Sequence, residues 1–364
     1  MIASFTFIVL SFLVTLLIAP FLIDLLYQFK IVRGRNFDDT LKIKGRKDKI
    51  GTPMMGGIII IISVIIITTI FNWNKYTQIP ILIFLIGSVL GAIDDLLNIF
   101  GKKKRKFKSF SHHLKLALYH KKISKRILYI VSLPWALYKS LFNSIGSRYG
   151  TGLYPHERIL IQFIEGAIVS YYIYFTLHID KIWIFPNTYI NLGWGIVILI
   201  FLIIIATANA VNITDGLDGL SAGVMLASFI TFMTIALFIG NESIAILCAT
   251  ISGALLVYIY FNIKPARVQM GDIGTLGLGS LLAVISIILQ REVILIIVGG
   301  IFVVETLSVI IQKISKRFFN KKVFLMSPLH HHLELKGWSE EKIVMRFWLF
   351  SFILAIIAIW VSII

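Results

Sequence analysis

Ten long apolar segments dominate the pattern of hydrophobic and polar positions along the chain. Each is close to the length of about 20 residues that a helix needs to cross the hydrocarbon core of a bilayer. The pattern predicts an all-α, polytopic integral membrane protein of about ten transmembrane helices, with residues 1–364 in a single domain. The predicted spans are approximately residues 2–25, 54–71, 79–96, 158–178, 193–211, 219–239, 243–261, 274–290, 292–312 and 343–363.

The composition supports this class and excludes others. Hydrophobic residues make up 58% of the 364 residues and charged residues only 15%, whereas soluble domains carry about 25% charged residues. Cys248 is the only cysteine, which excludes a disulfide framework and a metal or iron–sulfur site with several Cys ligands.

The positions of the basic residues predict the topology. The net charge is +17, and 30 of the 35 Lys and Arg residues lie in the four loops 27–52, 97–157, 262–273 and 313–342. Such loops face the cytoplasm under the positive-inside rule, so both termini are expected outside. The membrane topology therefore accounts for the positive net charge, and no nucleic-acid partner is expected. The first segment lacks a charged n-region and an A-x-A site, and is expected to be a retained span.

One apolar segment is too short to cross. Residues 127–138 contain Pro134 and are flanked by Lys125, Arg126 and Lys139, which favours an interfacial or re-entrant helix. Residues 102–150 are therefore expected to form a cytoplasmic insert on the membrane surface, between spans three and four. Its polybasic stretch 102–108 suits anionic lipid headgroups.

Acidic residues gather where apolar segments end. Asp94 and Asp95 end the third span, a second cluster follows the fifth span, and a third cluster follows the seventh; the last two contain Asn209, Asn212, Asp215, Asp218, Asn262 and Asp272. Asp215 and Asp218 are three residues apart and are expected on one side of a helical turn. Adjacent carboxylates persist where a cation neutralises them, and their hard oxygens favour Mg²⁺ or Mn²⁺. One such cluster is also typical of a capped helix start, but three on one predicted face favour a shared active site.

Two further motifs lie in the basic loops. His330, His331 and His332 are consecutive and cannot all point the same way, so phosphate contact is favoured over a three-His zinc site. Lys49 precedes Gly51, Gly56 and Gly57, and glycines beside a lysine suit a phosphate, although this signal is weak alone.

Together these stretches resemble the phospho-N-acetylmuramoyl-pentapeptide transferase family, within the polyprenyl-phosphate N-acetylhexosamine-1-phosphate transferase superfamily. The resemblance covers nearly the whole chain except the 102–150 insert. Its stretches are KIGTPMMGG at 49–57, the Asp pair at 94–95, NAVNITDGLDGL at 209–220, MGDIG at 270–274, GGIFVVETLSVI at 299–310 and PLHHHLELKGW at 328–338. The last of these separates the chain from the N-acetylglucosamine-1-phosphate transferase branch.

The resemblance implies a reaction. Phospho-MurNAc-pentapeptide passes from UDP-MurNAc-pentapeptide to undecaprenyl phosphate, which yields UMP and undecaprenyl-diphospho-MurNAc-pentapeptide (lipid I), the first membrane step of peptidoglycan synthesis. It also implies Mg²⁺ without an organic cofactor, a place in the bilayer of the bacterial cytoplasmic (inner) membrane, and compatibility with a homodimer. The active site is expected on the cytoplasmic face.

The resemblance also implies residue roles. By position, Asp272 is the expected Mg²⁺ ligand, and Asp94 is the expected base or nucleophile with Asp95 beside it. The uridine and diphosphate site would be lined by Asn209, Asn212, Asp215 and Asp218, assisted by Asn262 and Lys49. The diphosphate and sugar would contact His330, His331 and His332.

Four positions depart from the family pattern: Met54 replaces a Thr, Asn98 and Arg158 each replace a Lys, and Gln269 replaces the aromatic residue that stacks on uracil. The last departure makes the stacking contact an open question. Two other readings remain. One is the N-acetylglucosamine-1-phosphate branch, and the other is a transporter or channel, for which Glu165 and Glu305 are the main mid-span acids.

Overall fold

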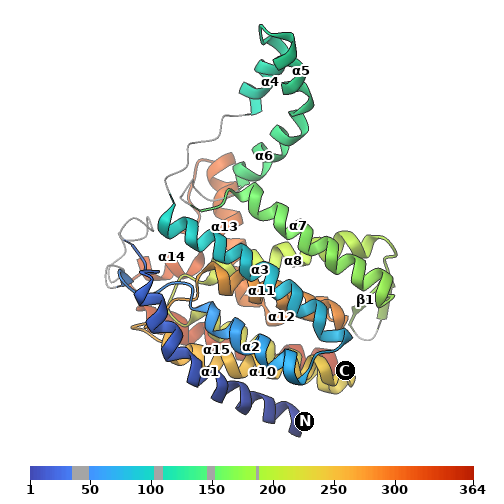
Figure 1. The fold of residues 1–364 in the computed structure, drawn as a ribbon, viewed down its shortest axis with the longest axis vertical. Coiled ribbons are helices and arrows are strands. Elements are labelled where there is room, and N and C mark those ends of the chain that lie inside the picture. Colours follow the sequence, from blue (N-terminus) through green and yellow to red (C-terminus); the bar gives the residue numbers. More distant parts are fainter. Residues whose placement is uncertain (35–48, 102–109, 146–151, 186–187) are drawn as a thin grey trace.

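The computed structural model describes residues 1–34, 49–101, 110–145, 152–185 and 188–364. The described part is a bundle of long helices with one small β-hairpin at its edge and a helical insert that extends away from the bundle (Figure 1). All ten segments that the sequence predicted as spans are helical.

Eight helices in the described part are long and apolar enough to cross a membrane. They are α1 (Ile2–Gln28), α3 (Lys75–Phe100), α7 (Pro155–Tyr171) continued by the π-helical turn η3 (Tyr172–Thr176), α8 (Gly195–Thr214), α9 (Leu220–Ile239), α10 (Glu242–Asn262), α11 (Gly271–Ile288) and α15 (Glu340–Ile363).

The prediction of ten spans needs two corrections. Helix α2 (Gly57–Phe71) has 15 residues, a length of about 22 Å, whereas the hydrocarbon core is about 30 Å thick. The predicted span 292–312 consists of α12 (Glu292–Val298) and α13 (Gly300–Phe318), which are bent by 79° where they meet at Gly299. Eight candidate spans, or nine with the bent pair as one, therefore lie in the described ranges. Hydrophobicity along the chain reports the length of an apolar run but not a change in its direction.

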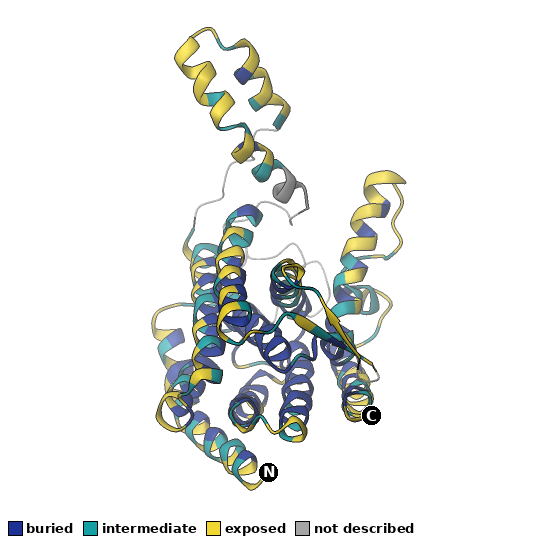
Figure 2. Ribbon diagram, turned by 90° about the vertical axis from the view of Figure 1, so that its right-hand side faces the viewer, coloured by how far each residue is buried: buried dark blue, intermediate teal, exposed yellow. Residues whose placement is uncertain are grey.

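Helix α11 lies at the centre of the bundle. In its most apolar stretch of 18 residues 89% of the residues are buried, against 28% in the corresponding stretch of α1 at the periphery. Figure 2 shows the buried helices surrounded by exposed outer faces. Glycines let neighbouring helices approach α11 closely. A Cβ added at Gly57 of α2 would lie 2.3 Å from the Cα of Gly274, so the two backbones are in contact.

The all-α prediction missed one small element. Strands β1 (Lys181–Ile184) and β2 (Thr188–Asn191) pair antiparallel, with Ile182 opposite Ile190. The Trp183 side chain is fully buried, and the Arg291 guanidinium lies 4.5 Å from the centre of its ring. This contact attaches the hairpin to the start of α12.

The described part of the insert contains three short helices, α4 (Phe110–Tyr119), α5 (Ile123–Val131) and α6 (Leu133–Ile145). The sequence predicted one helix over 127–138, but the chain breaks at Ser132. Pro134 then lies in the first turn of α6, where its missing N–H is tolerated. The predicted polybasic stretch 102–108 lies outside the described residues. The hydroxyl group of Tyr138 in α6 donates to the carbonyl of His156 in α7 at 2.8 Å, which ties the insert to the bundle.

Candidate active site

Two helices bring three carboxylates together at one end of the bundle. Asp94 and Asp95 lie near the end of α3, and Asp272 lies in the first turn of α11. Gly91 makes this possible, because a Cβ there would lie 2.0 Å from the carbonyl oxygen of Asp272. The buried Asp95 carboxylate accepts the backbone N–H of Ile273 at 3.0 Å and so caps the start of α11.

Arg158 joins two of these carboxylates. Its Nη2 atom pairs with Asp94 Oδ2 and lies 2.7 Å from Asp272 Oδ2. Asp94 is fully buried and also accepts hydrogen bonds from the backbone N–H of Leu153 and from Asn98 Nδ2. One guanidinium therefore offsets the repulsion between two acids. In the sequence Arg158 stands out only as a substitution of the family Lys; its position at the start of a span that begins on the same predicted face was the available signal.

Of the two predicted asparagines of α8, only Asn212 contacts this cluster. Asn212 Nδ2 donates to Asp272 Oδ1 at 2.7 Å and to Thr275 Oγ1 at 2.9 Å. Asn209 Nδ2 donates to Gln162 Oε1 at 3.0 Å and to the carbonyl of Ile205 at 2.7 Å. Asn212 therefore orients Asp272, whereas Asn209 is held by α7 and by its own helix.

A pocket of about 210 Å³ opens next to Asp272. Six of the predicted residues line it: Lys49, Asp215, Asp218, Asn262, Asp272 and His331. It is also lined by Arg33, Met54, Gly216, Leu217, Gln269, Met270 and Gly271. Helix α8 ends at Thr214, so Asp215 and Asp218 belong to the turn before α9. They do not share a helical turn as predicted, yet the turn still directs both toward the same pocket.

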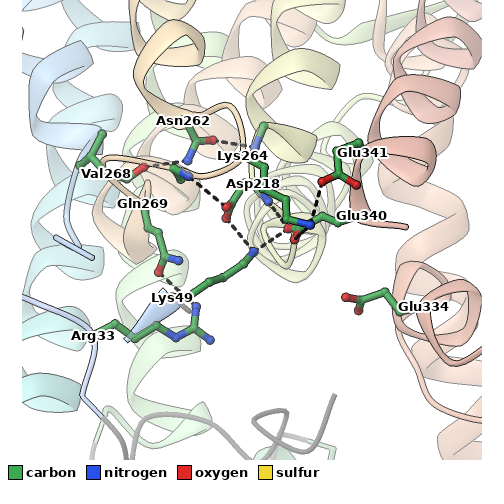
Figure 3. A network of polar contacts seen from close by, with 12 residues as sticks. Arg33, Lys49, Asp218, Asn262, Lys264, Val268, Gln269, Glu334, Glu340 and Glu341 are labelled. Atoms are coloured by element: carbon green, nitrogen blue, oxygen red, sulfur yellow. Dashed lines mark hydrogen bonds and ion pairs between the residues drawn. The ribbon is translucent and has the colours of Figure 1, made fainter. Parts of the chain in front are cut away.

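Lys49 lies between two carboxylates on the wall of this pocket (Figure 3). Its Nζ atom lies 2.7 Å from Asp218 Oδ1 and 2.5 Å from Glu340 Oε1. The same Glu340 oxygen accepts the backbone N–H of Asp218 at 2.8 Å. Asn262 Oδ1 accepts the N–H of Gly219 at 2.9 Å. These contacts connect the loop at 49, the turn at 215–219 and the start of α15. Glu340 is not among the site residues predicted from the sequence.

A second cation lies on the same wall. Arg33 Nη1 donates to Gln269 Oε1 at 3.1 Å, and both residues line the pocket. Gln269 holds its place in the chain through its backbone N–H, which donates to the carbonyl of Pro53 at 2.8 Å. At the position where the family has an aromatic ring, this chain therefore presents an amide bonded to a guanidinium.

The three histidines of α14 (Leu329–Leu335) point in different directions. His330 is buried, with its Nδ1 atom 3.1 Å from Glu305 Oε2 and its ring packed against Gly216. His331 lines the pocket, with its Nδ1 atom 2.8 Å from Glu334 Oε2. His332 accepts the backbone N–H of Leu325 at 3.1 Å and is not among the residues that line the pocket.

The charges around the pocket act on Asp215. The pKa of its carboxyl is raised from 3.8 to about 7, chiefly by burial and also by the nearby carboxylates of Asp272 and Asp218, against the opposing effect of Lys49 and Arg33. The pocket therefore combines closely spaced acids with cations that contact them, an arrangement suited to a divalent metal and an anionic ligand.

The residues present are compatible with a Mg²⁺ ion that uses substrate oxygens. Among the described residues, no three His, Cys, Asp or Glu side chains form a group that would hold a metal by themselves. Asp215 and Asp272 nevertheless line one pocket. Mg²⁺ is commonly bound by one or two carboxylates together with phosphates and waters, and a carboxylate that accepts one hydrogen bond per oxygen keeps further acceptor capacity.

The chain is similar to known glycosyl transferases. A family model, glycosyl transferase family 4, matches residues 150–290. This range includes α7 to α11 and the site residues Arg158, Asn212, Asp215, Asp218, Asn262 and Asp272. The class defined by fold and site is thus a polytopic membrane glycosyl transferase.

Full-length relatives narrow this class. The phospho-N-acetylmuramoyl-pentapeptide-transferase of Geobacillus sp. (strain WCH70) is 35% identical over 367 residues, covering 98% of this chain and 97% of the relative. The protein of the same name from Bacillus subtilis (strain 168) is 34% identical with the same coverage. This chain belongs to the phospho-N-acetylmuramoyl-pentapeptide transferase family, and it is a multi-pass membrane protein.

Proposed function

We propose that this chain transfers phospho-MurNAc-pentapeptide from UDP-MurNAc-pentapeptide to undecaprenyl phosphate and releases UMP. Lipid I is then its product, and the reaction is the first membrane step of peptidoglycan synthesis. The observation that carries the proposal is the family relationship over 98% of the chain. The meeting of Lys49, Asp218, Asn262, Asp272 and His331 around one pocket supports it.

The pocket suits the nucleotide diphosphate. Arg33 and Lys49 are cations on its wall, and cations of this kind contact phosphate oxygens with charge-assisted hydrogen bonds. Lys49 is buried and already held by two carboxylates, so its position is set before a substrate arrives. A preorganised cation loses little freedom on binding, which favours affinity.

Asp272 and Asp215 are the residues that we propose to hold Mg²⁺. The bound ion would neutralise the diphosphate charge and stabilise UMP as a leaving group. Asn212 and Arg158 fix the Asp272 carboxylate through bonds to its two oxygens. The orientation of the proposed ligand thus depends on α7 and α8 as well as on α11.

We favour a one-step transfer. An oxygen of the lipid phosphate attacks the phosphorus that carries the sugar, and the bridging P–O bond to UMP breaks. A two-step route would need Asp94 as nucleophile, but Asp94 is fully buried, is not among the residues lining the pocket, and is engaged by Arg158, Leu153 and Asn98. These contacts support a positioning role for Asp94, exerted on Arg158 and, through it, on Asp272.

The test is turnover by the purified full-length chain in detergent or nanodiscs. UMP release is measured with UDP-MurNAc-pentapeptide and undecaprenyl phosphate, with and without Mg²⁺, and UDP-GlcNAc replaces the donor in a parallel reaction. Mg²⁺-dependent release with the first donor alone supports the proposal. UMP release with UDP-GlcNAc alone would assign the chain to the N-acetylglucosamine-1-phosphate transferase branch. UMP release with neither donor would refute both activities.

A further inference from the structure

The insert carries an unusual helix that the transferase site does not use. Helix α5 has an aliphatic face and a polar face, as amphipathic helices do. The described contacts of α5 with α4 come from Arg126, which is exposed, and Tyr129, which is half-buried: Arg126 Nε donates to the carbonyl of Ala117 at 3.3 Å, and the Tyr129 ring lies 5.1 Å from the ring of His113. Its aliphatic side faces outward, with exposed fractions of 75% for Ile123, 57% for Ile127 and 73% for Val131.

This arrangement is the reverse of that in a water-soluble hairpin, in which the aliphatic face is buried between the helices. Leu128 and Ile130 continue the outward face at 64% and 47% exposure. A contiguous aliphatic face of this kind marks a surface that is covered by something else. The described residues do not cover it (Figure 2).

The basic residues of the insert indicate that an anionic surface covers this aliphatic face. Residues 99–156 contain no Asp or Glu but thirteen Lys and Arg. Lys121, Lys122 and Lys125 are exposed at the start of α5, next to its aliphatic face. A helix with aliphatic side chains on one face and lysines beside them is typical of segments that lie in the interface of an anionic bilayer.

The fold places this helix near a bilayer. Helix α6 has 13 residues, about 20 Å of helix, and it connects α5 to α7, which is a candidate span. The start of α7 also receives the Tyr138 hydrogen bond from α6. Trp135 of α6 is 44% exposed, and tryptophan is enriched at the headgroup level of membranes.

We propose that α5 docks its outward face, built from Ile123, Ile127, Leu128, Ile130 and Val131, into the anionic surface of the membrane that holds the bundle. The lysines at 121, 122 and 125 contact the lipid phosphates. The proposal requires only that the chain spans a bilayer, and it does not depend on the transferase reaction.

A site-specific fluorescent probe on the full-length chain tests the proposal. Cys248→Ala removes the only cysteine, and Ile127→Cys then carries an environment-sensitive dye in nanodiscs that contain lipids with quenchers in their acyl chains. Lys322→Cys, in the exposed loop after α13, is the matched control. We expect the dye at 127 to be quenched in phosphatidylglycerol discs and much less in phosphatidylcholine discs, with the dye at 322 quenched in neither.

The lysines supply the second readout. Replacing Lys121, Lys122 and Lys125 by Gln is expected to lower the docking equilibrium constant about 100-fold, since each lysine near an anionic surface contributes about a fivefold factor in affinity. Quenching at 127 that is equal in both lipids and unaffected by the lysine changes would overturn the choice of an anionic surface. Quenching that disappears with one chain per disc would assign the face to a second copy instead.

A measurement on the unmodified chain avoids the possibility that the substitutions disrupt the α4–α5 pair. Backbone amide exchange in residues 123–131 is expected to be slower in phosphatidylglycerol discs than in phosphatidylcholine discs. Identical exchange in the two lipids would refute the proposal without any mutant.

Discussion

Glu340 tests how this pocket is held together, because the adjacent Glu341 serves as a matched control. We predict that Glu340→Ala impairs turnover mainly by raising KM for the UDP donor, while Glu341→Ala has little effect. Both acids lie in the first turn of α15, so their contributions to helix stability through the helix dipole are alike. Both acids pair with Lys264, but only Glu340 also holds Lys49 and the Asp218 backbone.

The size of the expected loss in kcat/KM follows from how deeply each glutamate is buried. The Glu340 side chain is 9% exposed and that of Glu341 55%. Truncation at 340 leaves the Asp218 N–H without its acceptor and removes one of the two carboxylates from Lys49, and one unpaired buried group costs about 1–3 kcal/mol. If that cost falls on substrate binding, kcat/KM drops about 5- to 150-fold. An exposed pair contributes at most about 1 kcal/mol, so Glu341→Ala should cost less than about fivefold.

The assay is initial-rate UMP release against donor concentration, with thermal unfolding of each variant measured in the same detergent. Glu340→Gln keeps an oxygen that can accept from both Lys49 and Asp218, and it is expected to recover most of the lost affinity if hydrogen-bond geometry is what matters. Equal losses for Glu340→Ala and Glu341→Ala, or a loss at 340 with KM unchanged and a lowered Tm, would refute the positioning role.

Three other substitutions test single residues of the site. Asp272→Asn is expected to abolish Mg²⁺-dependent UMP release while the protein stays folded in the membrane; near-normal turnover at ordinary Mg²⁺ would exclude Asp272 as the ligand. Asp94→Asn is expected to lower kcat about 100-fold, because it weakens the contact through which Arg158 positions Asp272 and a small displacement of a reacting group can cost this much; an active Asp94→Asn beside an inactive Asp95→Asn would assign the positioning role to Asp95. Gln269→Phe is expected to tighten UMP binding about tenfold by calorimetry, because stacking of a base on an aromatic ring contributes about 1–3 kcal/mol; unchanged or weaker binding would place the uracil elsewhere.

The sequence alone was sufficient to predict the helical membrane fold and six of the residues that line the pocket. Apolar length is a local property, and all ten predicted segments are helices. The grouping of acids from distant clusters followed from topology, because span ends on one predicted face must lie at one end of a bundle. Asp94 and Asp272, 178 positions apart in the chain, indeed share Arg158.

Other features depend on tertiary contacts that no local pattern encodes. The bend at Gly299 and the short α2 are not visible in an apolar run, which reports only its length and period. The break at Ser132 did have a local signal, because Pro134 follows two residues later and is tolerated only in the first turn of a helix. Arg158 and Glu340 look like ordinary charges at helix starts until the fold places them against Asp94, Asp272 and Lys49. The outward aliphatic face of α5 was likewise invisible, because a helical wheel shows that a helix has two faces and only the packing on α4 decides which of them is left exposed.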